Sequence, residues 1–293
     1  MEFKSRNSLN ILIILFVLII ILGCVCPSDR NDGTESSDLD ANKQTSESED
    51  FNEMKSVKKE DKGDFVVKHT SVQNEKYASL DRSLKDAKVL EKAADKLNRT
   101  LSLPHDIVLQ TKDCGQVNAL YDPRDKSITF CYELMEDFFR LYKSAGDTDK
   151  EANERMNKAI TFVFLHELGH ALIDSYDLPI TGNEEDAADR CSSYICIEEL
   201  GEDGVKSILA AADAFDIDSK QRKPNQRNMA DEHLLQEQRF FNSLCMVYGS
   251  NTSQYSYIVD EGFLPKSRAK RCPSEYEKNA QAWMKLLEPW RKD

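Results

Sequence analysis

An H-E-x-x-H pattern lies inside a strongly apolar segment of this chain. Residues 160–174 read ITFVFLHELGHALID, with His166 and His170 four positions apart and Glu167 between them. Residues four apart lie on one face of an α-helix, so both imidazoles can point at one metal ion and Glu167 can reach a water beside it. Residues 162–165 are apolar, which is typical of a buried helix. Buried imidazoles and carboxylates are costly unless they are paired or coordinate a metal, so the segment predicts a zinc site.

The competing interpretation is a pair of ordinary core histidines that only make hydrogen bonds. The chain holds five histidines in 293 residues. A chance match to this pattern is therefore expected in about one such chain per hundred. The buried context makes coincidence rarer still, and we favour the metal interpretation.

Composition excludes one class of partner and indicates a compartment. The net charge is −13, from 52 acidic and 39 basic residues. General nucleic-acid binding needs a basic footprint, so nucleic acid is not an expected partner. Eight cysteines are many for a cytosolic protein, and no C-x-x-C pair indicates a structural zinc site. Disulfides in an oxidising compartment are the better explanation.

The N-terminus has the pattern of an export signal. Basic residues precede an almost purely apolar run, residues 11–22, which ends in Gly23 and Cys24. This junction looks like a lipoprotein processing box, which implies cleavage after residues 1–23 and lipid attachment to the Cys24 sulfur. The alternative is an uncleaved membrane anchor over residues 9–25, a length at the short end for a bilayer span. Both interpretations predict an extracytoplasmic domain tethered to the cell membrane.

A polar segment is expected to separate the membrane from the folded domain. Residues 24–76 are dominated by Ser, Asp, Glu, Asn and Lys, and they show almost no apolar periodicity. Such a segment buries too little surface to offset its ordering entropy, so it predicts a disordered stalk. The folded domain is expected to cover residues 77–293.

Periodicity within the domain predicts an α+β fold that is mainly helical, with a small N-terminal sheet. Besides the predicted helix that carries the H-E-x-x-H pattern (the metal helix, residues 160–174), helical spacing covers residues 78–97, 132–143, 204–215, 231–248 and 273–287. Strand-like segments cover residues 106–110, 117–121 and 127–131. A sheet ahead of an H-E-x-x-H helix resembles the zincin arrangement, and this resemblance implies an edge strand that binds extended peptide. We expect residues 128–131 to be that edge strand.

Two cysteine pairs follow from this layout. Cys114 and Cys131 would lie at matching ends of neighbouring strands, which favours a disulfide between them. A second disulfide between Cys245 and Cys272 would link two C-terminal helices. Cys191 and Cys196 are five apart on a helix, an awkward span for one bridge, and they stay unassigned.

An acidic cluster follows the metal helix. Residues 184–189 read EEDAAD, which resembles the E-x-x-x-D motif of the gluzincins. The resemblance implies that Glu185 is the third zinc ligand and that Asp189 hydrogen-bonds a ligand histidine and fixes its tautomer. The thermolysin type carries Asn where this chain has Glu184. Glu184, Asp186 and Asp189 therefore remain alternatives for the third ligand.

The folded part of the chain is similar to a family of unknown function described as "putative metallopeptidase" (domain of unknown function 4344). The similarity rests on the H-E-x-x-H segment and on shorter segments, which are NALYD (118–122), ITFCYEL (128–134), FLHELGHALI (164–173), EEDAAD (184–189), EQRFFN (237–242) and the LP-x-x-RA-x-x-C stretch (264–272). It implies a zincin-like metallopeptidase domain, zinc as cofactor and a protein or peptide substrate.

The expected chemistry is zinc-assisted hydrolysis of a peptide bond, with Glu167 as the general base. Candidate donors to the oxyanion are His233, Arg239, Tyr248 and Tyr255. Two alternatives stay open. One is a surface-binding lipoprotein that keeps a zincin fold without catalysis, and the other is a zinc hydrolase with a non-peptide substrate.

Overall fold

The computed structural model describes residues 58–222 and 232–292. The predicted export signal, Cys24 and most of the predicted stalk lie outside these residues. Within the described ranges, no helix is both long enough and apolar enough to cross a membrane.

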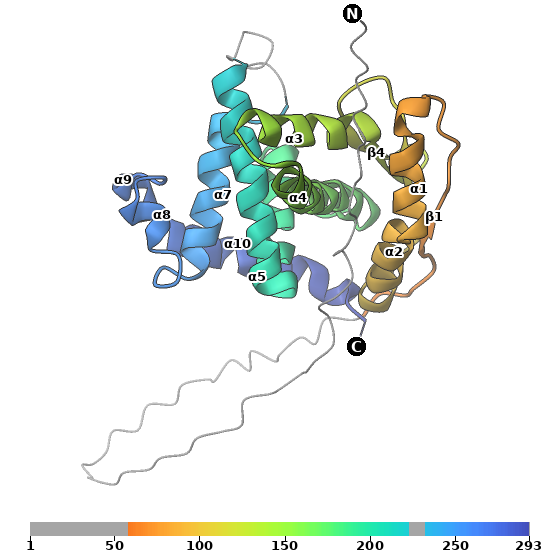
Figure 1. Ribbon diagram of the computed structural model, residues 1–293. Helices are drawn as coiled ribbons and strands as arrows, with labels where there is room; N and C mark the ends of the chain where they lie inside the picture. The colour runs from red at the N-terminus through yellow and green to blue at the C-terminus, as the bar shows by residue number, and fades with distance from the viewer. Residues whose placement is uncertain (1–57, 223–231, 293) are drawn as a thin grey trace, which may run out of the picture.

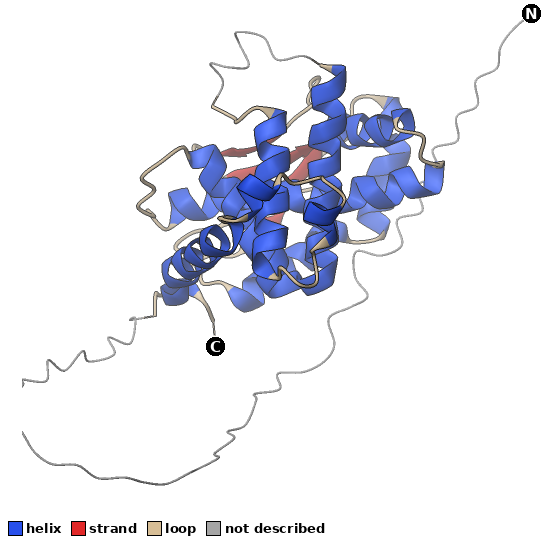
Figure 2. Cartoon of the chain, turned by 90° about the vertical axis from the view of Figure 1, so that its left-hand side faces the viewer, coloured by secondary structure: helices blue, strands red, loops and turns tan. Residues whose placement is uncertain are grey.

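Helices make up most of the described chain and pack around one small sheet (Figures 1 and 2), which confirms the predicted α+β class. The strands are β1 (Phe65–Val67), β2 (Ile107–Lys112), β3 (Ala119–Asp122) and β4 (Ser127–Cys131). The longer helices are α1 (Ala78–Asp86), α2 (Val89–Thr100), α3 (Tyr132–Ser144), α4 (Asp149–Ser175), α5 (Glu184–Gln221), α7 (Gln236–Ser250) and α10 (Cys272–Leu287). Two four-residue helices, α8 (Tyr257–Asp260) and α9 (Lys266–Ala269), lie between α7 and α10 in the chain. In Figure 1, α1 and α2 stand at one side of the molecule, α7 to α9 at the other, and α4 between them.

The sheet has the strand order β1-β2-β4-β3. β1, β2 and β4 are parallel, while β3 pairs antiparallel with β4. The prediction that residues 128–131 form the edge strand was therefore wrong, because β4 lies between β2 and β3. All five residues of β4 are buried, as suits an inner strand, and the half-exposed β3 is the edge beside α4.

The fold begins earlier than Tyr77, the predicted first ordered residue. Phe65 and its neighbours in β1 pair with β2, and the side chain of Asn98 on α2 holds this strand. Asn98 Oδ1 accepts a hydrogen bond from Phe65 N at 2.7 Å, and its Nδ2 donates to Phe65 O at 3.1 Å. A three-residue strand has no readable periodicity, so only these tertiary contacts reveal it.

The helix predicted over residues 78–97 is two helices. Lys88 adopts a left-handed conformation with φ 52°, which separates α1 from α2. The helix predicted over residues 204–215 is the second half of α5, which is kinked at Gly201 with φ 57°. Periodicity located these helices, but it does not detect a single left-handed residue that redirects the chain.

The helix α4, which carries the H-E-x-x-H residues, is capped at both ends. At its start, Thr148 Oγ1 accepts a hydrogen bond from Glu151 N while the Glu151 side chain accepts one from Thr148 N, a capping box. At its end, Asp177 has φ 50°, and Leu178 N donates to Ile173 O at 3.0 Å, a Schellman motif. Both caps fix the length and position of the helix that carries the H-E-x-x-H residues.

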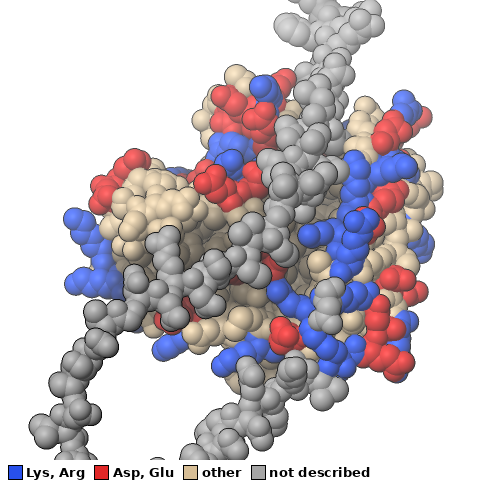
Figure 3. All heavy atoms as spheres, turned by 90° about the horizontal axis from the view of Figure 1, so that it is seen from below, with Lys and Arg blue, Asp and Glu red and all other residues tan. Residues whose placement is uncertain are grey.

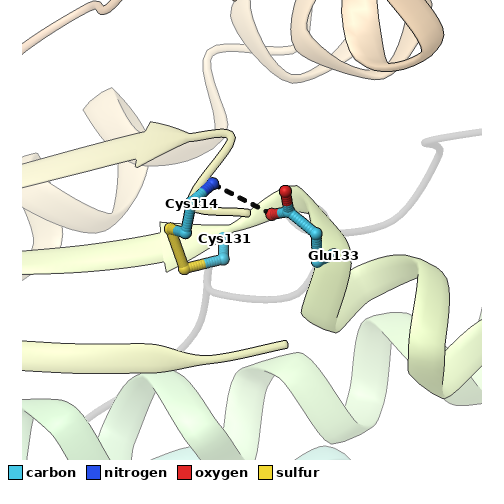
Figure 4. A group of neighbouring side chains, drawn as sticks. All are labelled: Cys114, Cys131 and Glu133. Atoms are coloured by element: carbon cyan, nitrogen blue, oxygen red, sulfur yellow. Dashed lines mark hydrogen bonds between the residues drawn. A yellow bond between two sulfur atoms is a disulfide. The ribbon is translucent and has the colours of Figure 1, made fainter. Parts of the chain in front are cut away.

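Both predicted disulfides are present, and Cys191 and Cys196 are buried free thiols. Figure 4 shows the Cys114–Cys131 bridge beside Glu133, whose carboxylate accepts hydrogen bonds from the backbone N–H groups of Cys114 and Gly115. These side chains resemble a metal-binding group by distance alone. Since the disulfide uses both sulfurs, no thiolate is left to bind a metal there.

Ion pairs connect distant parts of the described chain. Lys292 Nζ lies 2.5 Å from Asp61 Oδ2, which joins the first described residues to the last ones. On the face seen in Figure 3, acidic and basic side chains are interspersed rather than separated into areas of one sign. This mixture of the two signs moderates the effect of the net charge of −13 on that face.

Candidate metal centre

The two histidines of the H-E-x-x-H pattern lie on the side of α4 that packs against α5. His166 and Glu167 are 3% and 7% exposed, so both polar side chains are removed from solvent. The close approach of the two helices depends on Gly169. A Cβ atom on this residue would lie 3.1 Å from Ala188 Cα and 3.2 Å from Cys191 Cβ. The glycine inside the motif therefore lets α5 carry its acidic residues up to the two histidines.

Each imidazole is oriented by its own carboxylate. His166 Nδ1 lies 2.8 Å from Asp189 Oδ1, and His170 Nδ1 lies 2.8 Å from Glu184 Oε1. An ionised carboxylate only accepts hydrogen bonds, so each Nδ1 carries the proton. In the neutral tautomers this leaves the Nε2 lone pairs available to a metal, which is how proteins orient metal-binding histidines.

The two Nε2 atoms and one carboxylate oxygen converge on a common point. His166 Nε2 and His170 Nε2 are 3.2 Å apart, and Glu185 Oε2 lies 3.1 Å from the former and 3.3 Å from the latter. Ligand atoms at zinc-ligand distances of about 2.0–2.1 Å in a tetrahedron are separated by about 3.3 Å. The donor types and their mutual spacing therefore fit a zinc ion.

The four acidic residues at the start of α5 have different surroundings. Glu185 faces both imidazoles, while Glu184 and Asp189 bind the far nitrogens of His170 and His166. Asp186 is directed away from the histidines, with its oxygens 3.4 Å from Arg190 Nε and from Asn242 Nδ2. Of the alternatives left by the sequence, Glu185 alone has its carboxylate facing both Nε2 atoms.

The electrostatics of the cluster favour positive charge at this point. Burial opposes protonation of His166, but the charge and hydrogen bond of Asp189 and the hydrogen bond to Glu185 together outweigh it and raise the pKa of His166 to about 9. Burial alone would raise the pKa of Glu185, yet hydrogen bonds from His166, His170 and His233 hold this pKa well below its usual range. Carboxylates that keep their negative charge beside the two imidazoles suit a dication.

Glu167 has the surroundings of a proton acceptor. Its burial raises the pKa of the carboxyl, while the charges of His166 and His170 and a hydrogen bond from the Tyr121 backbone N–H oppose this rise. Tyr121 belongs to the edge strand β3, so Glu167 lies between the histidines and this strand. A carboxyl group with a raised pKa is better matched to proton transfer near neutral pH than an exposed one.

The contacts of Arg239 differ from those expected of an oxyanion donor. It was predicted as a candidate oxyanion donor, but its Nε and Nη2 lie 2.8 and 2.7 Å from the two oxygens of Asp189. Its guanidinium also covers the Phe215 ring, 4.2 Å from the ring centroid. Arg239 thus supports Asp189, which in turn orients His166. No spacing rule connects α7 to α5, so the sequence contains no signal for this contact.

Of the other candidates for the oxyanion site, His233 is brought to the cluster. His233 Nε2 lies 3.0 Å from Glu185 Oε2. Tyr248 and Tyr255 pack against the hydrophobic core. The orienting role of Glu184 on His170 was also missed, although an acid next to a predicted ligand on the same helix turn could have suggested it.

Comparison with known proteins supports the family resemblance. A family model described as "Putative metallopeptidase" matches residues 69–287. This range contains all the residues of the cluster. No curated protein and no solved structure matches the chain.

Proposed function

The chain belongs to the family described as "Putative metallopeptidase", whose model covers residues 69–287, and from this premise we propose that it is a zinc-dependent peptidase that acts outside the cytoplasm. The observation that carries the proposal is the convergence of two imidazole nitrogens and one carboxylate oxygen within 3.1–3.3 Å of one another, with the buried Glu167 beside them. The family implies a metal, and these donors fit one.

His166, His170 and Glu185 would hold the ion. Zinc bound there would supply Lewis acidity to a water molecule and to a substrate carbonyl. Glu167 accepts the proton of the attacking water on its carboxylate and passes it to the leaving amine. Asp189 and Glu184 keep the two imidazoles in the tautomer that binds a metal.

The edge strand β3 gives the proposal a place for an extended peptide. In the antiparallel pair with β4, Cys131 N donates to Asn118 O at 3.2 Å. Since hydrogen-bonded pairs alternate along such a ladder, Ala119 and Tyr121 direct their backbone N–H and C=O groups away from β4. The Tyr121 N–H is bonded to Glu167, so the N–H and C=O of Ala119 and the C=O of Tyr121 supply the hydrogen bonds to a peptide that adds to the sheet next to Glu167.

The test uses purified protein loaded with zinc and an unfolded protein such as reduced casein as substrate. We expect cleavage, and we expect Glu167→Gln to abolish it while zinc is still bound. Glu154→Gln is the matched control, since Glu154 lies on the same helix and its side chain is exposed. Zinc binding with no cleavage of casein or of a mixed peptide library would instead favour a non-catalytic surface protein or a hydrolase of non-peptide substrates.

The N-terminal segment tethers the peptidase to the membrane in this proposal. The supporting features are the apolar residues 11–22 and the Gly23–Cys24 junction. Expression of the full chain should yield a membrane-bound mature form whose N-terminal residue is a lipidated Cys24, seen by mass spectrometry. Cys24→Ser should block processing, while Cys26→Ser, two residues away, should leave it intact. Unprocessed protein that stays in the membrane fraction in both variants would favour the uncleaved anchor.

A further inference from the structure

A third histidine lies at the metal cluster on a segment without helical structure. His233 is in the short stretch that precedes α7, and its Nε2 lies 3.0 Å from Glu185 Oε2. Its ring is nearly parallel to that of His166, with an angle of 21° and 6.2 Å between the centroids. Donor atoms of His166, Glu185 and His233 all lie within 4.8 Å of one another. The pair formed by His166 and Glu185 is thus approached by two further imidazoles, those of His170 and His233.

The position of His233 is set by contacts on both sides of it. Asn183, the N-cap residue of α5, accepts a hydrogen bond from Asp186 N at its Oδ1. Its Nδ2 donates to the carbonyl oxygen of Glu232 at 2.7 Å. On the other side of His233, six residues later in the chain, Arg239 of α7 binds Asp189, which lies on α5 like Glu185. The segment is therefore attached to the first turns of α5, the turns that also carry Glu185.

We propose that His233 is a fourth, exchangeable protein ligand of the metal held by His166, His170 and Glu185. This inference rests on the proposed function, because it needs the metal site to exist. The first three ligands lie on helices and their side chains are at most 15% exposed, whereas the His233 side chain is 51% exposed. A ligand on an exposed, non-helical segment can leave the site without disturbing the core, and the others cannot.

The consequence is a resting site that is closed. Structural zinc sites have four protein ligands, and catalytic ones keep one position for water or substrate. With His233 bound, the site has four protein ligands like a structural zinc site. When His233 leaves, it has the open position of a catalytic site. A small ligand for the open position therefore has to displace His233, and its apparent affinity is reduced by the fraction of molecules in the closed state.

The experiment measures metal coordination rather than peptidase activity. The zinc dissociation constant is determined by competition with a chromophoric chelator for the wild type, His233→Ala and His170→Ala. The Co²⁺-substituted proteins are then titrated with azide while their visible absorption is recorded. His69→Ala is the matched control, because His69 Nε2 also lies 2.9 Å from a glutamate, Glu91, and is half exposed, yet lies outside the cluster. Circular dichroism checks that each variant is folded.

We expect His233→Ala to weaken zinc binding by about tenfold, the lower end of the loss seen when a supporting group of a metal site is removed. His170→Ala should weaken it more, and His69→Ala should leave it unchanged. The cobalt spectrum of His233→Ala should differ from that of the wild type, and azide should bind this variant more tightly. An unchanged zinc affinity, cobalt spectrum and azide affinity in His233→Ala would overturn the inference and leave the proposed function standing. Failure of the wild type to bind zinc would overturn both.

Discussion

Arg239 binds both carboxylate oxygens of Asp189, with Nε 2.8 Å from Oδ2 and Nη2 2.7 Å from Oδ1. Asp189 is in turn hydrogen-bonded to Nδ1 of His166. The arginine comes from α7, the aspartate from α5 and the histidine from α4. Three helices therefore meet at one imidazole, and the orientation of that ring depends on a residue that never reaches the metal position itself.

Arg239→Lys should weaken zinc binding by about ten- to a hundredfold, as is typical when the partner of a ligand histidine is disturbed. Lysine keeps the positive charge but cannot make the two coplanar hydrogen bonds that fix Asp189. The zinc dissociation constant measures the effect. Arg155→Lys is the control, because Arg155 also binds aspartates, Asp147 and Asp213, and covers an aromatic ring, but at another place in the fold. Equal affinities in the two lysine variants would show that Arg239 is not a positioning residue.

Gly169→Ala should destabilise the protein although alanine favours helices. Alanine in a helix interior is better than glycine by about 1 kcal/mol. The new methyl group, however, would meet Ala188 Cα at 3.1 Å and Cys191 Cβ at 3.2 Å. Overpacking of this kind costs about 1–3 kcal/mol, and backbone atoms of α5 cannot rotate away, so we expect a net loss in the free energy of unfolding.

The same substitution should also weaken zinc binding, because α5 has to move outward and Glu185 moves with it. Urea denaturation of the metal-free protein separates the stability effect from the effect on affinity. Gly182→Ala is the control, since a Cβ there meets no atom within 4 Å. A gain in stability for Gly169→Ala, with unchanged zinc affinity, would contradict this account of the helix contact.

Reduction of the two disulfides should lower the stability of the domain. The bridges close segments with sequence separations of 17 and 27 residues. Loop-closure entropy alone predicts a contribution of about 3 kcal/mol from the first and about 3.5 kcal/mol from the second. Denaturation with and without dithiothreitol measures the sum. A variant with all four bridged cysteines replaced by alanine should no longer respond to the reductant, and a response that persists would point to another cause.

The sequence predicts those parts of the site whose residues lie close together in the chain. His166, Glu167 and His170 belong to one helix, so their spacing alone predicts a shared face. Glu185 and Asp189 were reached through resemblance to a known motif, and the structure places them beside the histidines. Contacts of Arg239 and His233 with these residues join segments 50 or so positions apart, and no periodicity connects such segments.

The sheet illustrates the same limit. The turn between residues 122 and 127 and the flanking apolar residues identify β3 and β4, and the second of these matches its predicted range. Which of them lies at the edge depends on where β2 and β1 insert, and this is a matter of long-range pairing. β2 pairs in parallel with the side of β4 that β3 does not occupy. For this reason β4, which the sequence predicted to be the edge strand, lies inside the sheet.

Acid should weaken the contact between the two ends of the described chain. The hydrogen bond from Lys292 lowers the pKa of Asp61 below the ordinary value of an aspartate, about 3.9. A carboxyl group with a depressed folded-state pKa adds stability that is present above the unfolded value and is lost as the pH falls through the folded value. The wild type should therefore be more stable than Asp61→Asn at pH 6, and the difference should shrink once the pH falls below about 3.9 and disappear below the lower folded-state pKa. Because the pair is largely exposed, the difference should stay below about 1 kcal/mol.

Ala119→Pro tests whether the outer side of β3 binds the substrate. Proline is tolerated in an edge strand where the N–H points outward, as the register predicts for Ala119. The substitution removes one donor that a bound peptide would use, so kcat/KM for casein should fall by about two- to tenfold, the effect of one hydrogen bond. Zinc affinity and the free energy of unfolding should change little. Leu120→Pro is the contrasting variant, because the N–H of Leu120 faces Thr129 on β4 and its loss should destabilise the sheet. Unchanged kcat/KM in a folded, zinc-loaded Ala119→Pro protein would mean that peptide does not add to this edge.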